Sequence, residues 1–286
     1  MTIGRLVTTR PSTSTTARAG LTTIVTVVGS GLASTAGLRG SNDLTGLCSS
    51  FFAVGGGCFS VQNLAGLDNA SHLQELRLIN TKLSDISALR SLTGLRSLWL
   101  DNTAVTTLSA LANLVQLEEL SLSNTRVDDL SPVAALKRLR SLNVEGTGIS
   151  DLVPLAGMVG LEELALADTA VDDISPLQLL TGLQQLQLQG TGVTDLAPLA
   201  SLTNVETLNL GRTAVVDVSP LAGMISLCDL YLNATRVTDI SALAPLPQLE
   251  FLELRDTAID DKRVADLKRQ RPSLTIIQAT PTRFDR

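Results

Sequence analysis

A threonine recurs every 22 residues through most of this chain, and this period constrains the fold more than any other feature. It occupies Thr81, Thr103, Thr125, Thr147, Thr169, Thr191, Thr213, Thr235 and Thr257. Blocks of 22 residues written from Leu73 give nine units that end at Gln270 without a gap. A unit of this length cannot bury its apolar face alone, so neighbouring units must stack. The sequence therefore predicts a solenoid.

Within each of the first eight units, apolar residues fall at positions 1, 4, 6, 11, 14, 17 and 20. In the fifth unit these are Leu161, Leu164, Leu166, Val171, Ile174, Leu177 and Leu180. The alternation around positions 4 and 6 predicts a short strand with one buried face, and the three-residue spacing of positions 14, 17 and 20 predicts a tight helical turn. We expect an α/β repeat in which the strands form one concave parallel sheet and short helices form the convex side.

Turn residues repeat with the same period. The pairs Ser131-Pro132, Ser175-Pro176 and Ser219-Pro220 predict a helix start with Ser as the N-cap and Pro at the first helical position. Asp occupies position 13 in eight of the nine units, namely Asp85, Asp129, Asp151, Asp173, Asp195, Asp217, Asp239 and Asp261. We expect these carboxylates to accept backbone N–H groups, because one carboxylate per turn lacks the six to eight oxygens that calcium prefers. The threonines at position 9 are likewise expected to be structural.

The repeated pattern LxxLxxLxLxxT-x-V-x-D-[IL]-S-P-L resembles the 22-residue internalin-type class of leucine-rich repeats, over residues 73–270. The chain departs from that class at position 9, where Thr stands in place of the usual Asn. The resemblance implies a right-handed leucine-rich-repeat solenoid and a concave face that binds protein. It implies no particular partner.

The ends of the chain depart from the repeat. Residues 51–72 fit the frame imperfectly and are interpreted as a degenerate N-terminal capping repeat. Residues 260–270 predict an amphipathic cap helix, and 271–286 a last strand followed by a tail. Residues 1–50 are interpreted as a flexible leader with a weak apolar run.

Three interpretations of the leader remain open: a secretory signal that ends near Ala36, an unstructured leader, or a tethering helix. A signal would place the protein outside the cell or on its surface, and a cytoplasmic location is the alternative. Cys48 and Cys58 lie ten residues apart, close enough for a disulfide in an oxidising compartment, whereas in the cytosol they stay reduced.

Charge excludes some classes of partner. Residues 51–254 carry ten basic and 22 acidic residues, which would repel a phosphate backbone, so nucleic acid is not expected. No run of 18 or more strongly apolar residues is present, and no membrane span is predicted.

Residues suited to catalysis are sparse. His72 is the only histidine, Cys228 has no basic neighbour in sequence, and Gly55-Gly56-Gly57 lacks the Lys and Ser/Thr of a phosphate loop. We predict no catalytic residue, metal or cofactor, and an enzyme would need groups that the sequence does not offer. The favoured function is a monomeric protein-binding scaffold. An intracellular adaptor or regulatory subunit of an enzyme complex is the alternative.

The binding face is predicted from the strands, because positions 3, 5 and 7 point out of the concave sheet. The only Trp and the only Tyr, Trp99 and Tyr231, both occupy position 5, and Phe251 stands at position 3 beside Tyr231. Large exposed aromatic residues are favoured in binding hot spots. The predicted protein-binding residues are Arg77, Trp99, Asp101, Glu119, Asn143, Glu145, Glu163, Gln187, Asn209, Asp229, Tyr231 and Phe251.

The middle of the arc is expected to be negative. No Lys or Arg lies between Arg140 and Arg212, where nine acidic residues occur: Glu145, Asp151, Glu162, Glu163, Asp168, Asp172, Asp173, Asp195 and Glu206. A partner that touches this region would then present a basic surface.

Overall fold

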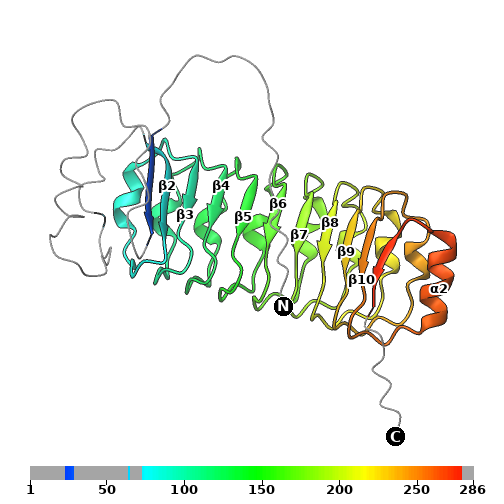
Figure 1. The fold of residues 1–286 in the computed structure, drawn as a ribbon. Helices are drawn as coiled ribbons and strands as arrows, with labels where there is room; N and C mark the ends of the chain where they lie inside the picture. The colour runs from blue at the N-terminus through cyan, green and yellow to red at the C-terminus, as the bar shows by residue number, and fades with distance from the viewer. Residues whose placement is uncertain (1–22, 29–63, 65–72, 279–286) are drawn as a thin grey trace, which may run out of the picture.

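One parallel sheet runs the length of the molecule in the computed structural model, which describes residues 23–28, 64 and 73–278. Figure 1 shows the strands side by side along one face of an elongated body, with the short helices behind them. The strands follow one another in chain order. Their bounds are β1 Thr23–Val28, β2 Leu73–Ile79, β3 Ser97–Trp99, β4 Glu119–Ser121, β5 Ser141–Asn143, β6 Glu163–Ala165, β7 Gln185–Gln187, β8 Thr207–Asn209, β9 Asp229–Tyr231, β10 Phe251–Glu253 and β11 Thr275–Ile277.

Short 3-10 helices return the chain from one strand to the next on the convex side. They are η2 Ser87–Ser91, η3 Ser109–Leu111, η4 Ser131–Val133, η5 Val153–Leu155, η6 Ser175–Leu179, η7 Ala197–Leu199, η8 Ser219–Gly223 and η9 Ser241–Leu243. The ninth repeat instead carries the α-helix α2, Asp261–Gln270, which begins after Asp260 accepts the Arg263 N–H at 2.8 Å. This arrangement confirms the predicted right-handed leucine-rich-repeat solenoid with its concave parallel sheet.

The core is a stack of aliphatic layers. All seven predicted positions of the fifth repeat are buried, from Leu161 to Leu180, with exposed fractions of 0 to 2%. The same positions of the neighbouring repeats belong to one continuous cluster. Each fully buried Leu or Val contributes about 1.5–3 kcal/mol by leaving water, and stacking allows every inner repeat to bury these residues on both sides.

The threonine of position 9 has a structural role, as predicted. In every repeat its hydroxyl donates to the carbonyl of position 6 in the same repeat, as Thr147 does to Val144 at 2.6 Å. These threonines are buried except Thr257 in the last repeat, so the bond satisfies a carbonyl that water does not reach. Position 9 therefore fixes the turn that follows each strand.

Position 8 adopts the left-handed conformation in all nine repeats, which the sequence analysis did not anticipate. Its φ is positive at Asn80, Asn102, Asn124, Gly146, Asp168, Gly190, Arg212, Ala234 and Asp256. Gly, Asn and Asp tolerate this region well, and seven of the nine repeats have one of them there. Arg212 and Ala234 adopt it at a cost in conformational energy.

The start of the 3-10 helices corrects the prediction that Ser is the N-cap. In η4 the N-cap is Leu130, without a side-chain cap, and Ser131 is the first helical residue. The cap comes from two residues upstream, because the carboxylate of Asp129 accepts the Ser131 N–H at 2.7 Å. The same bond forms at Asp85, Asp151, Asp173, Asp195, Asp217 and Asp239. The prediction for position 13 is thus confirmed in seven repeats, while Asp261 lies instead in the first turn of α2.

The N-terminal edge of the sheet differs from the expectation. Strand β1 lies within the presumed leader and pairs in parallel with β2, where residues 51–72 were expected to supply the neighbouring repeat. All six residues of β1 are β-branched, Thr, Ile or Val, and such residues favour extended backbone. Except for Leu64, which is buried, the proposed capping repeat lies outside the described residues.

Candidate functional site on the concave sheet

The predicted binding column is held in strict register. From β2 to β10, each strand pairs with the next so that position 5 of one repeat lies opposite position 5 of its neighbour, without a shift. The residues of this row are Arg77, Trp99, Ser121, Asn143, Ala165, Gln187, Asn209, Tyr231 and Glu253. Positions 3 and 7 form parallel rows on either side, because alternate residues of a strand share a face. We call these three rows the concave face.

Near its N-terminal end, the concave face has a cation–π pair. The Arg77 guanidinium lies over the Trp99 ring at 4.1 Å from the ring centroid, and Trp99 is half-buried. Glu75 lies 3.9 Å from the same guanidinium, while Arg77 Nε is buried and has no hydrogen-bond partner among the described residues. One face of the indole is therefore already covered, so Arg77 and Trp99 form a single preorganised unit.

Near its C-terminal end, the face has an aromatic pair. The Tyr231 and Phe251 rings lie 5.3 Å apart between centroids at an interplanar angle of 46°, a favourable tilted geometry. Both are half-buried. This contact places Phe251 beside Tyr231, as the sequence indicated. Asp229 precedes this pair on β9, at position 3.

Amide side chains line the floor between the two pairs. Asn143 and Asn209 have the same role, since each side-chain oxygen accepts the N–H two residues on, at 3.0 Å. Their NH₂ groups make no further hydrogen bond in the described part of the chain. Gln187 is half-buried between them, and Gln189 Oε1 is buried without a hydrogen-bond partner in the ranges that the structure describes. The floor therefore presents amide groups with unused hydrogen-bonding capacity to a ligand.

The predicted acidic residues divide between the concave face and other surfaces. Asp101 accepts the Ser121 hydroxyl and the Ser123 N–H, and Glu163 accepts the Ser141 hydroxyl. Of the nine acids between Arg140 and Arg212, only Glu145 and Glu163 occupy concave positions. The others stand at position 2, at position 8, or in the turns that precede the 3-10 helices. They include the helix-capping Asp151, Asp173 and Asp195.

The concave face is nevertheless negative overall. Positions 3, 5 and 7 of the nine repeats carry seven carboxylates and two guanidinium groups, a net charge of −5. The carboxylates belong to Glu75, Asp101, Glu119, Glu145, Glu163, Asp229 and Glu253, and the guanidinium groups to Arg77 and Arg255. The negative charge is thus spread along the whole face and is not concentrated at its centre.

Cys228 is the cysteine that lies among the described residues. Burial raises the pKa of its thiol, and the neighbouring Glu206, Glu250 and Asp229 raise it further. A thiol held in the protonated form is a poor nucleophile. Cys48, Cys58, His72 and the glycines 55–57 lie outside the described residues.

The described part of the chain contains no group of three or more His, Cys, Asp or Glu side chains placed to hold a metal ion. None of the helices described is long and apolar enough to cross a bilayer.

Comparison with known proteins identifies the class. A family model described as "Leucine Rich repeats (2 copies)" matches residues 71–113 and 115–157. The crystal structure of an internalin (inlC2) from Listeria monocytogenes shares 32% identity with a TM-score of 0.61, over 67% of this chain and 84% of that chain. The chain belongs to the internalin-type leucine-rich-repeat proteins.

Two further structures define how far the likeness extends. An internalin (inlF) from Listeria monocytogenes shares 34% identity with a TM-score of 0.72, over 77% of this chain, which spans only 64% of that protein. The ectodomain of the Arabidopsis thaliana receptor kinase GASSHO1/SCHENGEN3, in complex with CASPARIAN STRIP INTEGRITY FACTOR 2, shares 22% identity with a TM-score of 0.63, over 77% of this chain and 29% of that one. This last likeness concerns the fold alone. No curated protein matches the chain.

Proposed function

We propose that this chain is a non-catalytic scaffold that binds another protein on its concave face. The observation that carries the proposal is the in-register column that has the Arg77–Trp99 pair near one end and the Tyr231–Phe251 pair near the other. Aromatic and Arg side chains bury much area at a small cost in conformational entropy, so they serve as anchors in protein interfaces.

The spacing of the anchors favours a macromolecule over a small ligand. Six strand intervals of about 4.8 Å separate Trp99 from Tyr231, a span of about 29 Å. Between them lie the amides of Asn143, Gln187 and Asn209 and the acids Glu119, Glu145 and Glu163. A net charge of −5 on this face fits a partner with a basic surface, whose association rate would fall as ionic strength rises.

Affinity measurements on single variants test the proposal. The partner is first recovered from the native host with the full chain, and its affinity is then measured by calorimetry. Trp99→Ala and Tyr231→Ala should each weaken binding by about tenfold or more, as hot-spot residues do. Leu179→Ala is the control, because Leu179 is 62% exposed at the end of η6 on the convex side. Unchanged affinity in both aromatic variants, together with loss in the control, would place binding on the convex side.

We further propose that the protein acts outside the cell or on its surface. The proposal rests on Arg5, Arg10 and Arg18, which precede an apolar run as in a secretory signal. Cleavage near Ala36 would remove β1 and leave β2 as the edge of the sheet. N-terminal sequencing of the protein from its native host shows whether Thr23–Val28 is removed with a signal or retained as a strand of the sheet. A start at Met1 or Thr2 would contradict secretion by cleavage.

A further inference from the structure

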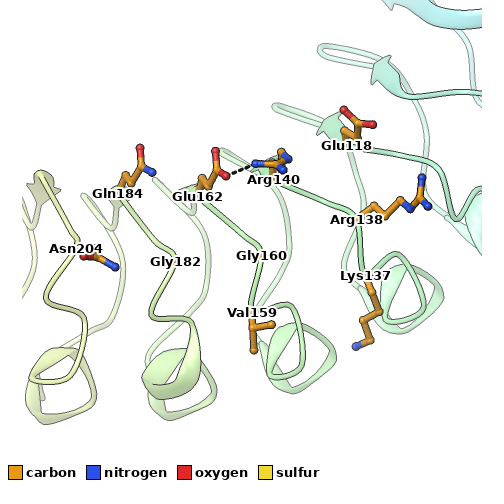
Figure 2. Close-up of a pocket in the computed structure, with 10 residues that line it drawn as sticks. All are labelled: Glu118, Lys137, Arg138, Arg140, Val159, Gly160, Glu162, Gly182, Gln184 and Asn204. Atoms are coloured by element: carbon orange, nitrogen blue, oxygen red, sulfur yellow. Dashed lines mark hydrogen bonds and ion pairs between the residues drawn. The ribbon is translucent and has the colours of Figure 1, made fainter.

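A polar groove lies on one flank of the solenoid, away from the concave face. It has a volume of about 670 Å³ and lies where the chain returns from the convex helices to strands β4 to β8. Figure 2 shows its lining residues following one another across four repeats: Glu118, Lys137, Arg138, Arg140, Val159, Gly160, Glu162, Gly182, Gln184 and Asn204.

Charged side chains are distributed unevenly along this flank groove. Glu118 is paired with Arg96 at 2.6 Å, and Glu162 is paired with Arg140. Two cationic side chains at the same end have no acidic partner among the described residues. Arg138 donates to the neutral amide of Gln116, and the Lys137 ammonium group extends over Gly157 of the next repeat. The other end, at Gly182, Gln184 and Asn204, carries no charge.

The floor of the groove exposes main chain. Position 22 is glycine in two successive repeats along the groove, Gly160 and Gly182, as it is at Gly94 in the first repeat. The repeats on either side of this pair carry Arg138 and Asn204 there. The N–H and C=O groups of both glycines make no hydrogen bond within the described residues. A Cβ at Gly182 would come within 2.9 Å of the Val159 carbonyl, whereas a Cβ at Gly160 would meet nothing within 4 Å. Free donors and acceptors in an extended row are suited to another main chain.

We propose that this flank groove binds an acidic, extended segment of a partner protein. Lys137 and Arg138 supply positive charge at one end of the groove for separate acidic side chains of that segment, and Gly160 and Gly182 form hydrogen bonds with its main chain. The groove crosses three repeat intervals of about 4.8 Å, or about 14 Å, which accommodates four or five extended residues. The chain's own leader is a poor occupant, because Arg5, Arg10 and Arg18 would repel the same basic end.

The two surfaces therefore favour partners of opposite charge. The concave face carries a net charge of −5 and fits a basic partner, while the flank groove has two unpaired cations and fits an acidic one. The proposal does not depend on concave binding, because the two surfaces share no residue.

Peptide binding to the full chain tests the proposal. The probe is a fluorescent peptide of alternating Glu and Ser, compared with one of alternating Lys and Ser, and binding is followed by anisotropy at low ionic strength. Lys137→Glu combined with Arg138→Glu should weaken binding of the acidic peptide by about tenfold or more. Arg126→Glu combined with Arg236→Glu is the matched control, because it changes net charge equally at exposed residues outside the groove.

A second variant separates the groove from a simple basic patch. Gly160→Gln fills the floor and is compatible with the fold, because Gln occupies position 22 at Gln116 and Gln248 and a Cβ at Gly160 has open space. We expect it to reduce binding of the acidic peptide by a similar factor, with an unchanged unfolding temperature. Absence of binding, equal binding of the lysine peptide, equal loss in the control, or full binding by Gly160→Gln would each overturn the proposal.

Discussion

Ala234 should be replaceable by glycine with a gain in stability. It has a φ of +55° in the left-handed region, where an L-residue other than Gly pays about 1–2 kcal/mol. Glycine relieves this cost but loses about 0.5–1 kcal/mol more conformational entropy on folding. Ala234 is exposed, so little packing is lost, and its N–H bond to the Arg255 carbonyl at 2.8 Å is kept. The net expectation is a gain of about 0.5–1 kcal/mol in the free energy of unfolding.

Urea unfolding of the full chain measures this difference. The control is Ala170→Gly, because Ala170 is also exposed but has no positive φ, so the greater backbone entropy of Gly in the unfolded chain should cost about 0.5–1 kcal/mol. Ala234→Asn is a second test, since Asn occupies position 8 in the first three repeats. If Ala234→Gly destabilises the protein as much as Ala170→Gly does, strain at position 8 is not the explanation.

Other substitutions test further parts of the repeat. Thr147→Val should lower the free energy of unfolding by about 1–2 kcal/mol, because the Val144 carbonyl loses its buried hydrogen-bond partner. The control is Thr106→Val at an exposed position, which should change the free energy of unfolding little. Equal effects of the two substitutions would refute the structural role of position 9. Gly190→Ala should lower the free energy of unfolding by about 1–3 kcal/mol, because φ is +71° there. The new Cβ would also lie 2.1 Å from Asp168 Oδ1 and disturb the 3.0 Å ion pair of Asp168 with Arg212. Stability equal to that of the wild type would contradict this account. Hydrogen bonds from the backbone and side chain of Ser175 lower the pKa of Asp173 from its ordinary value of 3.8. The ionised Asp173 therefore stabilises the fold above about pH 4, and this stabilisation is lost as the pH falls through the lowered pKa of the folded state. Asp173→Asn combined with Asp217→Asn should therefore reduce the fall in unfolding temperature between about pH 5 and pH 3, and an identical fall in both proteins would argue against capping by position 13.

The periodic part of the structure could be predicted from the sequence because each inner repeat buries the same apolar positions against its neighbours. Leu164 and Val171 are buried where the pattern placed them, and the hydroxyls of position 9 and the carboxylates of position 13 make the expected structural bonds. Register followed from the constant 22-residue period, which allows no slip between strands.

Other features could not be predicted from this pattern. Position 8 contains Asn, Gly, Asp, Arg and Ala, so its shared backbone conformation has no single residue signature. The predominance of Asn and Gly there was the available signal. Strand β1 comes from outside the repeat, and its β-branched run was interpreted as an apolar leader. The flank groove depends on Gly160 and Gly182 at position 22, side by side in space but 22 residues apart.

The central claim, that a protein partner sits on the concave face, is tested most directly by site-specific photocrosslinking. A benzophenone amino acid is placed at Gln187, on β7 between the two anchor pairs, or at Leu179 in η6 behind it. The two sites lie in consecutive repeats on opposite faces of the solenoid. Our account predicts that the purified partner crosslinks through residue 187 and not through residue 179. Crosslinking through residue 179 alone would contradict it.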